Sequence, residues 1–139
     1  MNVDALVQLS TGEIAFTWRD DKYTGQGWHV PGGIIRFQEK METRLRKVVK
    51  YELGVKLLHF NGPTNVNQII APAVVERSHF LSPLFICDLS SCEEEKLRKL
   101  AAEKPDYCLL ADGVPKNLLS WHHIYREEIK TRTRSHQIL

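Results

Sequence analysis

The sequence predicts one α/β domain of the α+β type, in which a mixed β-sheet is sandwiched between helices. Its 139 residues match the usual size of one domain, and 42% hydrophobic with 26% charged residues is typical of a soluble globular protein. Short apolar runs bounded by turn residues alternate with segments of helical period, and no repeat, low-complexity stretch or linker interrupts them. We therefore expect residues 1–139 to form a single domain.

The first third of the chain predicts short strands joined by turns. "VDALVQLSTGEIAFTWRD" consists of two apolar runs separated by "STGE", which predicts a β-hairpin with strands near 3–9 and 13–19. "WHVPGG" and "IIRF" predict a strand, a glycine-rich turn and a second short strand, because paired glycines permit backbone conformations that are closed to other residues.

A change of period from Glu42 to Leu53 predicts an amphipathic helix. Its apolar residues at positions 45, 48, 49 and 53 recur at intervals of three and four, so they share one face. Gly54 follows directly and predicts the C-terminal cap of this helix.

The second half of the chain continues the alternation of strands and helices. We expect strands at 55–60, 66–75, 79–89 and 106–112, and helices over 90–104 and 114–130. Ser91 and Glu94 have the spacing of a capping box, and Pro115 suits the first turn of the last helix. The basic segment 130–139, "KTRTRSHQIL", predicts a frayed and solvated tail.

Charge and cysteine content narrow the classes of function. The net charge is only +2 and the basic residues are scattered outside the tail, which suits a small anionic ligand better than nucleic acid. The spacings of Cys87, Cys92 and Cys108 match neither a zinc site nor a redox pair. No export signal or membrane-spanning segment is evident. We expect a cytoplasmic protein with reduced thiols and with neither nucleic acid nor membrane as a partner.

One stretch carries a recognisable motif. Gly33, five residues, Glu39 and then a helix that ends "YELGV" have the length of the Nudix box, and the chain resembles the Nudix hydrolases over roughly residues 3–130. The matching positions are Gly33, Glu39, Val49, Glu52, Gly54 and Val55. Lys47 stands where the box has arginine, while Val48 and Tyr51 replace two glutamates. The resemblance implies the Nudix fold and cleavage of a nucleoside diphosphate linked to another group.

The two missing glutamates limit the metal chemistry. Glutamates at 48, 51 and 52 would leave one face of the helix and could share several divalent cations. Glu52 alone cannot hold such a cluster, but Mg²⁺ often binds through only one or two carboxylates, together with water and substrate phosphates. The loss of the two glutamates therefore argues against a mechanism with several metal ions, but it remains compatible with a single metal ion.

This departure resembles the GDP-mannose mannosyl hydrolase branch of the family, whose box is degenerate in a similar way. That branch cleaves the bond between the sugar carbon and the phosphate oxygen, with one Mg²⁺ neutralising the departing diphosphate. The resemblance therefore implies a nucleotide-sugar substrate, most readily GDP-mannose, the cofactor Mg²⁺ or Mn²⁺ in its place, and a homodimer.

The same resemblance implies roles for individual residues. The metal ligands would be the carbonyl of Gly32 and the carboxylates of Glu52 and Glu103. Catalytic roles would fall to Arg19, Lys47, His79 and Lys104, the last of which aligns with the general-base histidine of the branch. Substrate contacts would come from Asp4 at the sugar, Arg19 at the diphosphate, and Arg36 in place of an arginine that is Ile34 here.

Several alternatives remain open at the level of sequence. Glu103 and Lys104 also suit a solvated loop, and His79 suits a half-buried strand position. Glu39 suits a structural role at the junction of loop and helix, and the neighbouring histidines His122 and His123 suit packing and surface positions. The whole chain could be a binding module without turnover, or a conventional diphosphatase that cleaves between phosphorus atoms.

Overall fold

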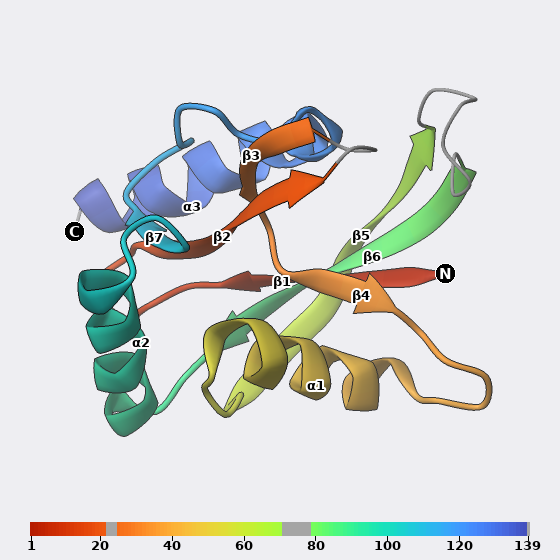
Figure 1. Cartoon of the computed structure of the whole chain (residues 1–139), viewed down its shortest axis with the longest axis horizontal. Coiled ribbons are helices and arrows are strands. Elements are labelled where there is room, and N and C mark those ends of the chain that lie inside the picture. The colour runs from red at the N-terminus through yellow and green to blue at the C-terminus, as the bar shows by residue number, and fades with distance from the viewer. Residues whose placement is uncertain (22–24, 71–78, 139) are drawn as a thin grey trace.

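The structure is a computed structural model that describes residues 1–21, 25–70 and 79–138. These parts of the chain contain seven strands, three α-helices and one 3₁₀ helix, and Figure 1 shows their arrangement. In chain order they are β1 (Asn2–Val7), β2 (Ile14–Asp21), β3 (Gly25–His29), β4 (Gly32–Ile34), α1 (Met41–Leu53), β5 (His59–Ile70), β6 (His79–Asp88), α2 (Ser91–Glu103), β7 (Cys108–Ala111), η1 (Ser120–Tyr125) and α3 (Arg126–Ile138).

The chain forms a single α+β domain, as predicted, but its strands are divided between two sheets and not joined in one. The four-stranded sheet has the order β4-β1-β6-β5 and is mixed, because β1 and β6 are parallel while the other pairs are antiparallel. The three-stranded sheet has the order β3-β2-β7 and is antiparallel. Helices α1 and α3 lie on opposite sides of the four-stranded sheet (Figure 1).

The predicted N-terminal hairpin is wrong beyond its turn. The turn exists, since the N–H of Leu9 donates to the carbonyl of Glu13 at 2.8 Å and Gln8 bridges to Ile14. Beyond it the two strands separate, and β1 joins the four-stranded sheet while β2 joins the other. All six residues of β1 are buried, so the strand has neighbours on both faces and its apolar run does not identify the partner.

Helix α1 forms almost as predicted and packs on the sheet through its apolar face. Leu45, Val48, Val49 and Leu53 are its buried residues, and the predicted cap Gly54 adopts φ 71° while its N–H donates to Lys50. Gly33 of β4 permits the close approach, because a Cβ there would lie 2.8 Å from Cγ2 of Val48. Position 48, which is acidic in the full box, is therefore part of the packing between helix and sheet.

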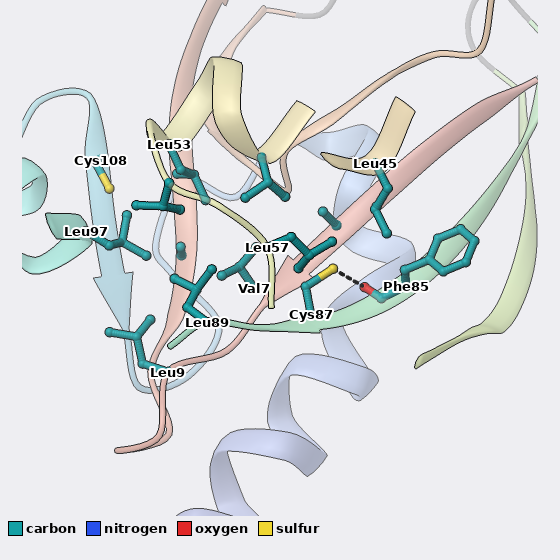
Figure 2. Packing of buried hydrophobic residues seen from close by; sticks show 14 of the residues in the cluster. Val7, Leu9, Leu45, Leu53, Leu57, Phe85, Cys87, Leu89, Leu97 and Cys108 are labelled. Carbon is teal, nitrogen blue, oxygen red and sulfur yellow. Dashed lines mark hydrogen bonds between the residues drawn. The ribbon is translucent and has the colours of Figure 1, made fainter. Parts of the chain in front are cut away.

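Two hydrophobic clusters fill the two sides of the sheet. Figure 2 shows the first, which combines residues of α1, β1, β6 and α2 and includes Cys87 and Cys108. The second lies beneath α3 and includes Phe16, Leu84 and Ile129. All three cysteines are free, and burial raises the pKa of Cys87 to about 12 and that of Cys108 to about 11. These two thiols act as small apolar core groups.

Two details of the middle of the chain differ from the prediction. Strand β5 is continuous from His59 to Ile70, with a shift of register between Asn61 and Asn65 where we expected a break. Residues 71–75 of the predicted strand lie outside the described residues. Helix α2 is capped by Ser90, which accepts a hydrogen bond from the N–H of Glu93, so the predicted capping pair is displaced by one residue.

The C-terminal segment departs most from the prediction. Residues 117–119 pair with β3, since Trp28 donates to Asn117 at 2.9 Å and Leu119 donates to Trp28 at 2.7 Å. The 3₁₀ helix η1 follows, and α3 begins only at Arg126. The predicted tail is helical through Ile138, and Thr133 is buried. No helix in the described parts of the chain is both long and apolar enough to cross a membrane.

The pairing of residues 117–119 with β3 depends on Gly27. A Cβ at Gly27 would lie 2.7 Å from the carbonyl oxygen of Asn117, a backbone atom that cannot rotate away. We predict that Gly27→Ala lowers the free energy of unfolding by about 1–3 kcal/mol, the usual cost of an overpacked site. Urea denaturation measures this, with Gln26→Ala at an exposed position of the same strand as the control. Equal stability of the two variants would contradict the close approach.

Candidate active site

A cavity of about 1210 Å³ opens beside α1, β4 and η1. Its volume is sufficient for a nucleotide-sized ligand. Seven of the described residues that line it carry cationic side chains: Arg19, Arg36, Arg44, Arg46, Lys47, Lys50 and Lys56. Only Asp4 and Glu52 among these lining residues carry carboxylates. The cavity therefore attracts anions by its charge.

Glu52 lies on α1 and joins this helix to three strands. Its Oε1 accepts a hydrogen bond from Oγ1 of Thr17 on β2 at 3.2 Å and lies 3.1 Å from Nε2 of His29 on β3. Its Oε2 accepts from the N–H of Gly32 on β4 at 2.9 Å. These contacts with β2, β3 and β4 hold the carboxylate in one orientation at the cavity.

His29 is a partner of Glu52 that the sequence analysis did not identify. Its ring is buried, and Nδ1 lies 2.8 Å from the carbonyl oxygen of Thr17. A carbonyl only accepts hydrogen bonds, so Nδ1 carries a proton and Nε2 faces the Glu52 carboxylate. The residue directly precedes "VPGG" in the chain, and in the structure it lies on the same face of β3 as the buried Gly27.

Gly32 lies next to Glu52, as its predicted role requires. In the β1–β4 ladder Gly32 is opposite Asp4, between the pairs in which Ala5 donates to Pro31 and Ile35 donates to Met1. In an antiparallel ladder, every second pair of residues makes no hydrogen bonds across the strands, and Gly32 belongs to such a pair. Its N–H and C=O therefore both point away from β1, to the side where the N–H binds Glu52. Glycine is required here, because a Cβ would lie 2.0 Å from Oδ1 of Asp4.

Asp4 lines the cavity but is 1% exposed and held by the protein itself. Ser82 donates to its Oδ2 at 2.7 Å, the hydroxyl of Tyr125 donates to the same oxygen, and Asn2 donates to Oδ1 at 3.2 Å. Burial raises the pKa of Asp4 to about 6, against the lowering effect of the bonds from Tyr125 and Ser82. The contact between Asp4 and a sugar remains a prediction.

Glu39 has the structural role that was expected for it. Arg44 binds both its oxygens, with Nε at 2.7 Å and Nη2 at 3.0 Å, and the N–H of Arg36 donates to it at 3.1 Å. Lys47 lies 3.2 Å away. The bond from Arg44 is the main cause that lowers the pKa of Glu39 to about 2. This carboxylate fixes the loop before α1 and keeps three cationic residues together at the cavity.

The structure also brings Arg19, Arg36 and Lys47 to the lining of the cavity. Arg19 lies on β2, with its Nε 3.9 Å from Asp21. The Lys47 side chain is 60% exposed, so its ammonium group remains accessible to a ligand while it pairs with Glu39. These three residues therefore satisfy the first requirement of their predicted roles, which is access to one shared space.

Glu103, Lys104 and His79 are not among the residues that line the cavity. Glu103 lies 3.9 Å from Lys99 on the surface of α2. The backbone of Lys104 ends α2 and accepts hydrogen bonds from Tyr107 and Cys108. His79 is exposed at the start of β6 beside Gln68, with 2.6 Å between their Nε2 atoms. The predicted third metal ligand and general base are therefore not assembled with Glu52 in this structure.

The loop after α2 reaches the cavity through a different residue. The hydroxyl of Tyr107 donates to the backbone carbonyl of Glu52 at 2.7 Å, and its ring lines the cavity. Sequence alone did not identify it, because its position depends on the turn after α2, in which the N–H groups of Tyr107 and Cys108 both donate to the carbonyl of Lys104. His122 also lines the cavity and is buried, where burial lowers its pKa to about 3, whereas His123 is exposed.

The residues fit a single metal ion that is shared with a substrate, and they do not fit a cluster. Among the described residues, no three side chains of the types His, Cys, Asp and Glu gather as a metal site. Thr17 and His29 occupy Oε1 of Glu52 and the N–H of Gly32 occupies one side of Oε2, which leaves one lone pair on Oε2, and the carbonyl of Gly32 lies on the same side. Such a pair suits Mg²⁺ when phosphates and water complete its octahedron.

Comparison with solved structures identifies the fold. A MutT Nudix hydrolase from Burkholderia pseudomallei matches with a TM-score of 0.69 at 22% identity, covering 93% of this chain and 96% of that chain. A mutT/nudix family protein from Listeria innocua matches with a TM-score of 0.63 at 17% identity, covering 99% and 94%. NrtR from Shewanella oneidensis matches at 0.60 and 15%, covering 98% of this chain and 62% of that chain.

These similarities show that the chain has the Nudix fold, as the motif implied. Neither a protein-family model nor a curated protein matches the sequence. At identities of 15–22%, the structural similarity establishes the fold alone. Proteins that share one fold can have many different activities. The activity has to be argued from the site.

The raised pKa of Asp4 predicts a pH dependence of stability. Between its ordinary value of 3.8 and about 6 the folded state binds more protons, so stability falls as pH rises through this window and is level above it. Asp4→Asn removes this term. We expect the free energy of unfolding of the wild type, minus that of Asp4→Asn, to fall by roughly 3 kcal/mol between pH 3.8 and pH 7.

Urea denaturation of both proteins across this pH range measures the difference. His122 acts in the opposite direction, because its lowered pKa reduces stability as pH falls, but it is present in both proteins and cancels. A difference that is independent of pH would show that the carboxyl group of Asp4 titrates normally.

Proposed function

We propose that the protein is a magnesium-dependent hydrolase of a nucleoside diphosphate sugar, with GDP-mannose as the first candidate substrate. The observation that carries this proposal is the position of Glu52 and Gly32 at the wall of a cavity lined by cationic side chains. A diphosphate supplies the anionic charge that such a cavity selects, and its volume leaves room for the base and the sugar.

In this proposal the side chains act mainly on the leaving group. Arg19, Arg36 and Lys47 bind the diphosphate and stabilise the charge that develops when the bond from sugar carbon to oxygen breaks. Glu52 and Gly32 would hold Mg²⁺, or Mn²⁺ in its place, which neutralises further negative charge when bound. The products are then a nucleoside diphosphate and a free sugar.

Water attack proceeds in this proposal without Lys104, which lies outside the cavity. A diphosphate whose charge is neutralised is a good leaving group, so displacement at carbon depends less on activation of water than attack at phosphorus does. Attack at phosphorus is the less favoured route, because Val48 is packed against Gly33 and Tyr51 is 90% exposed where the full box has glutamates.

A binding module without turnover is the second candidate. The observation that favours it is the position of Glu103 and Lys104 outside the cavity, which leaves Glu52 and Gly32 as the assembled part of the predicted metal site. Such a module would retain the cationic side chains and bind the nucleotide sugar as a sensor. The small-molecule partner is the same in both candidates. A homodimer, and the lack of nucleic-acid and membrane partners, remain predictions.

Glu52→Gln tests the metal site. We predict a loss of turnover with GDP-mannose and Mg²⁺ of roughly 100-fold or more, because the amide keeps the shape but not the charge of the carboxylate. Mn²⁺ binding, followed by electron paramagnetic resonance in the presence of GDP, should weaken in parallel. Glu42→Gln is the matched control, since Glu42 is exposed on the same helix and pairs with Arg46. Unchanged turnover and unchanged Mn²⁺ affinity would remove Glu52 from the site.

Hydrolysis in oxygen-18 water tests the position of attack. If Arg19 and Lys47 stabilise a departing diphosphate, the label should be found on the released sugar, whose anomeric configuration is inverted at first release. The nucleoside diphosphate should carry no label by mass spectrometry. Label on phosphate, with a nucleoside monophosphate and a sugar phosphate as products, would establish conventional Nudix chemistry. Tight binding without any product would establish the binding module.

A further inference from the structure

The cavity has an aromatic wall apart from its cationic side chains. Phe80 of β6 and Trp121 of η1 both line the cavity, with ring centroids 6.1 Å apart and ring planes at 47°. Leu119 and the 37% exposed side chain of Ile34 also line it. Large aromatic and aliphatic groups of this kind are typical of sites for the apolar part of a ligand.

This wall and the cations of α1 come from opposite sides of the four-stranded sheet. Phe80 has the same parity on β6 as Ser82 and Leu84, which face Asp4 and Tyr125 on the side of α3. Arg44 and Lys47 belong to α1, and this helix lies on the other side of the sheet (Figure 1). Their shared cavity therefore presents an aromatic surface from one side and positive charge from the other.

A nucleotide has the same division, with a flat base at one end and charged phosphates at the other. Given the proposed function, we infer that the wall formed by Phe80 and Trp121 binds the nucleobase, which stacks on the indole of Trp121. The diphosphate then extends past Gly32 toward Arg36 and Lys47. Stacking depends on the area of the rings, so this arrangement favours purine over pyrimidine nucleotides.

The position of Trp121 is set by the fold. Residues 117–119 pair with β3 through two backbone hydrogen bonds, and η1 begins at the next residue. On its inner side η1 is anchored by His122, whose Nδ1 accepts a hydrogen bond from the N–H of Val30 at 2.9 Å. The indole is therefore carried by a fixed element, which reduces the conformational cost of stacking a base on it.

Calorimetry with GDP, UDP and inorganic pyrophosphate, each with Mg²⁺, tests this inference. For the wild type we expect tighter binding of GDP than of UDP or pyrophosphate. Trp121→Ala should weaken GDP binding by about 5- to 150-fold and leave pyrophosphate binding unchanged. Trp121→Phe should retain most of the affinity for GDP. Trp18→Phe is the control, because Trp18 packs against Trp28 and does not line the cavity.

Fluorescence gives a second reading that does not depend on the alanine variant folding well. GDP should quench the emission of the wild type and of Trp18→Phe, and this quenching should be lost in Trp121→Phe. Equal affinities of GDP and pyrophosphate, or quenching that persists in Trp121→Phe, would overturn the base site while leaving the phosphate site intact. Failure of the wild type to bind any of the three ligands would overturn the proposed function as well.

Discussion

The candidate site depends on one largely enclosed carboxylate. Glu52 is 13% exposed, and its oxygens bind groups on β2, β3 and β4 while its helix packs on the four-stranded sheet. A carboxylate in this position is tolerated only because it is hydrogen-bonded, and each such bond to a charged group contributes about 1.5–3 kcal/mol. The same three contacts that hold the two sheets and α1 together also fix the direction of the free lone pair. Structural and functional roles therefore meet in one side chain.

The two neighbouring glycines of β4 serve the two faces of the sheet separately. Gly32 leaves space for Asp4 on the side of α3, and Gly33 leaves space for Val48 on the side of α1. Strand alternation requires that adjacent residues face opposite ways, so a single pair of glycines brings both layers close to the cavity. This explains how a strand of only three residues can position the wall of the site.

The sequence was informative wherever a local signal coincided with the tertiary arrangement. The period of α1 and its cap at Gly54 were predicted to within one residue at each end, and Glu39 has the role that its position before the helix indicated. Glu103 and Lys104 were expected in a polar loop beside the metal, but they form the last residue and the C-cap of α2, outside the lining of the cavity. Tyr107 was missed because its position depends on the turn after α2. The separation of β1 from β2 was missed because buried strands do not specify their partners.

The balance of charge in the cavity indicates how the two substitutions in the box change what the site attracts. A helix with three clustered glutamates would attract divalent cations first, and phosphates would then bind to the metal. Here Val48 and Tyr51 bring no charge, Asp4 is buried among its own donors, and Glu52 is held by His29. Seven cationic residues surround these two carboxylates. The local potential therefore favours an anion over a free cation. Under the proposed function, a metal ion would bind best with a phosphate already present to share it, so the substitution of two glutamates would change the order in which ligand and metal bind.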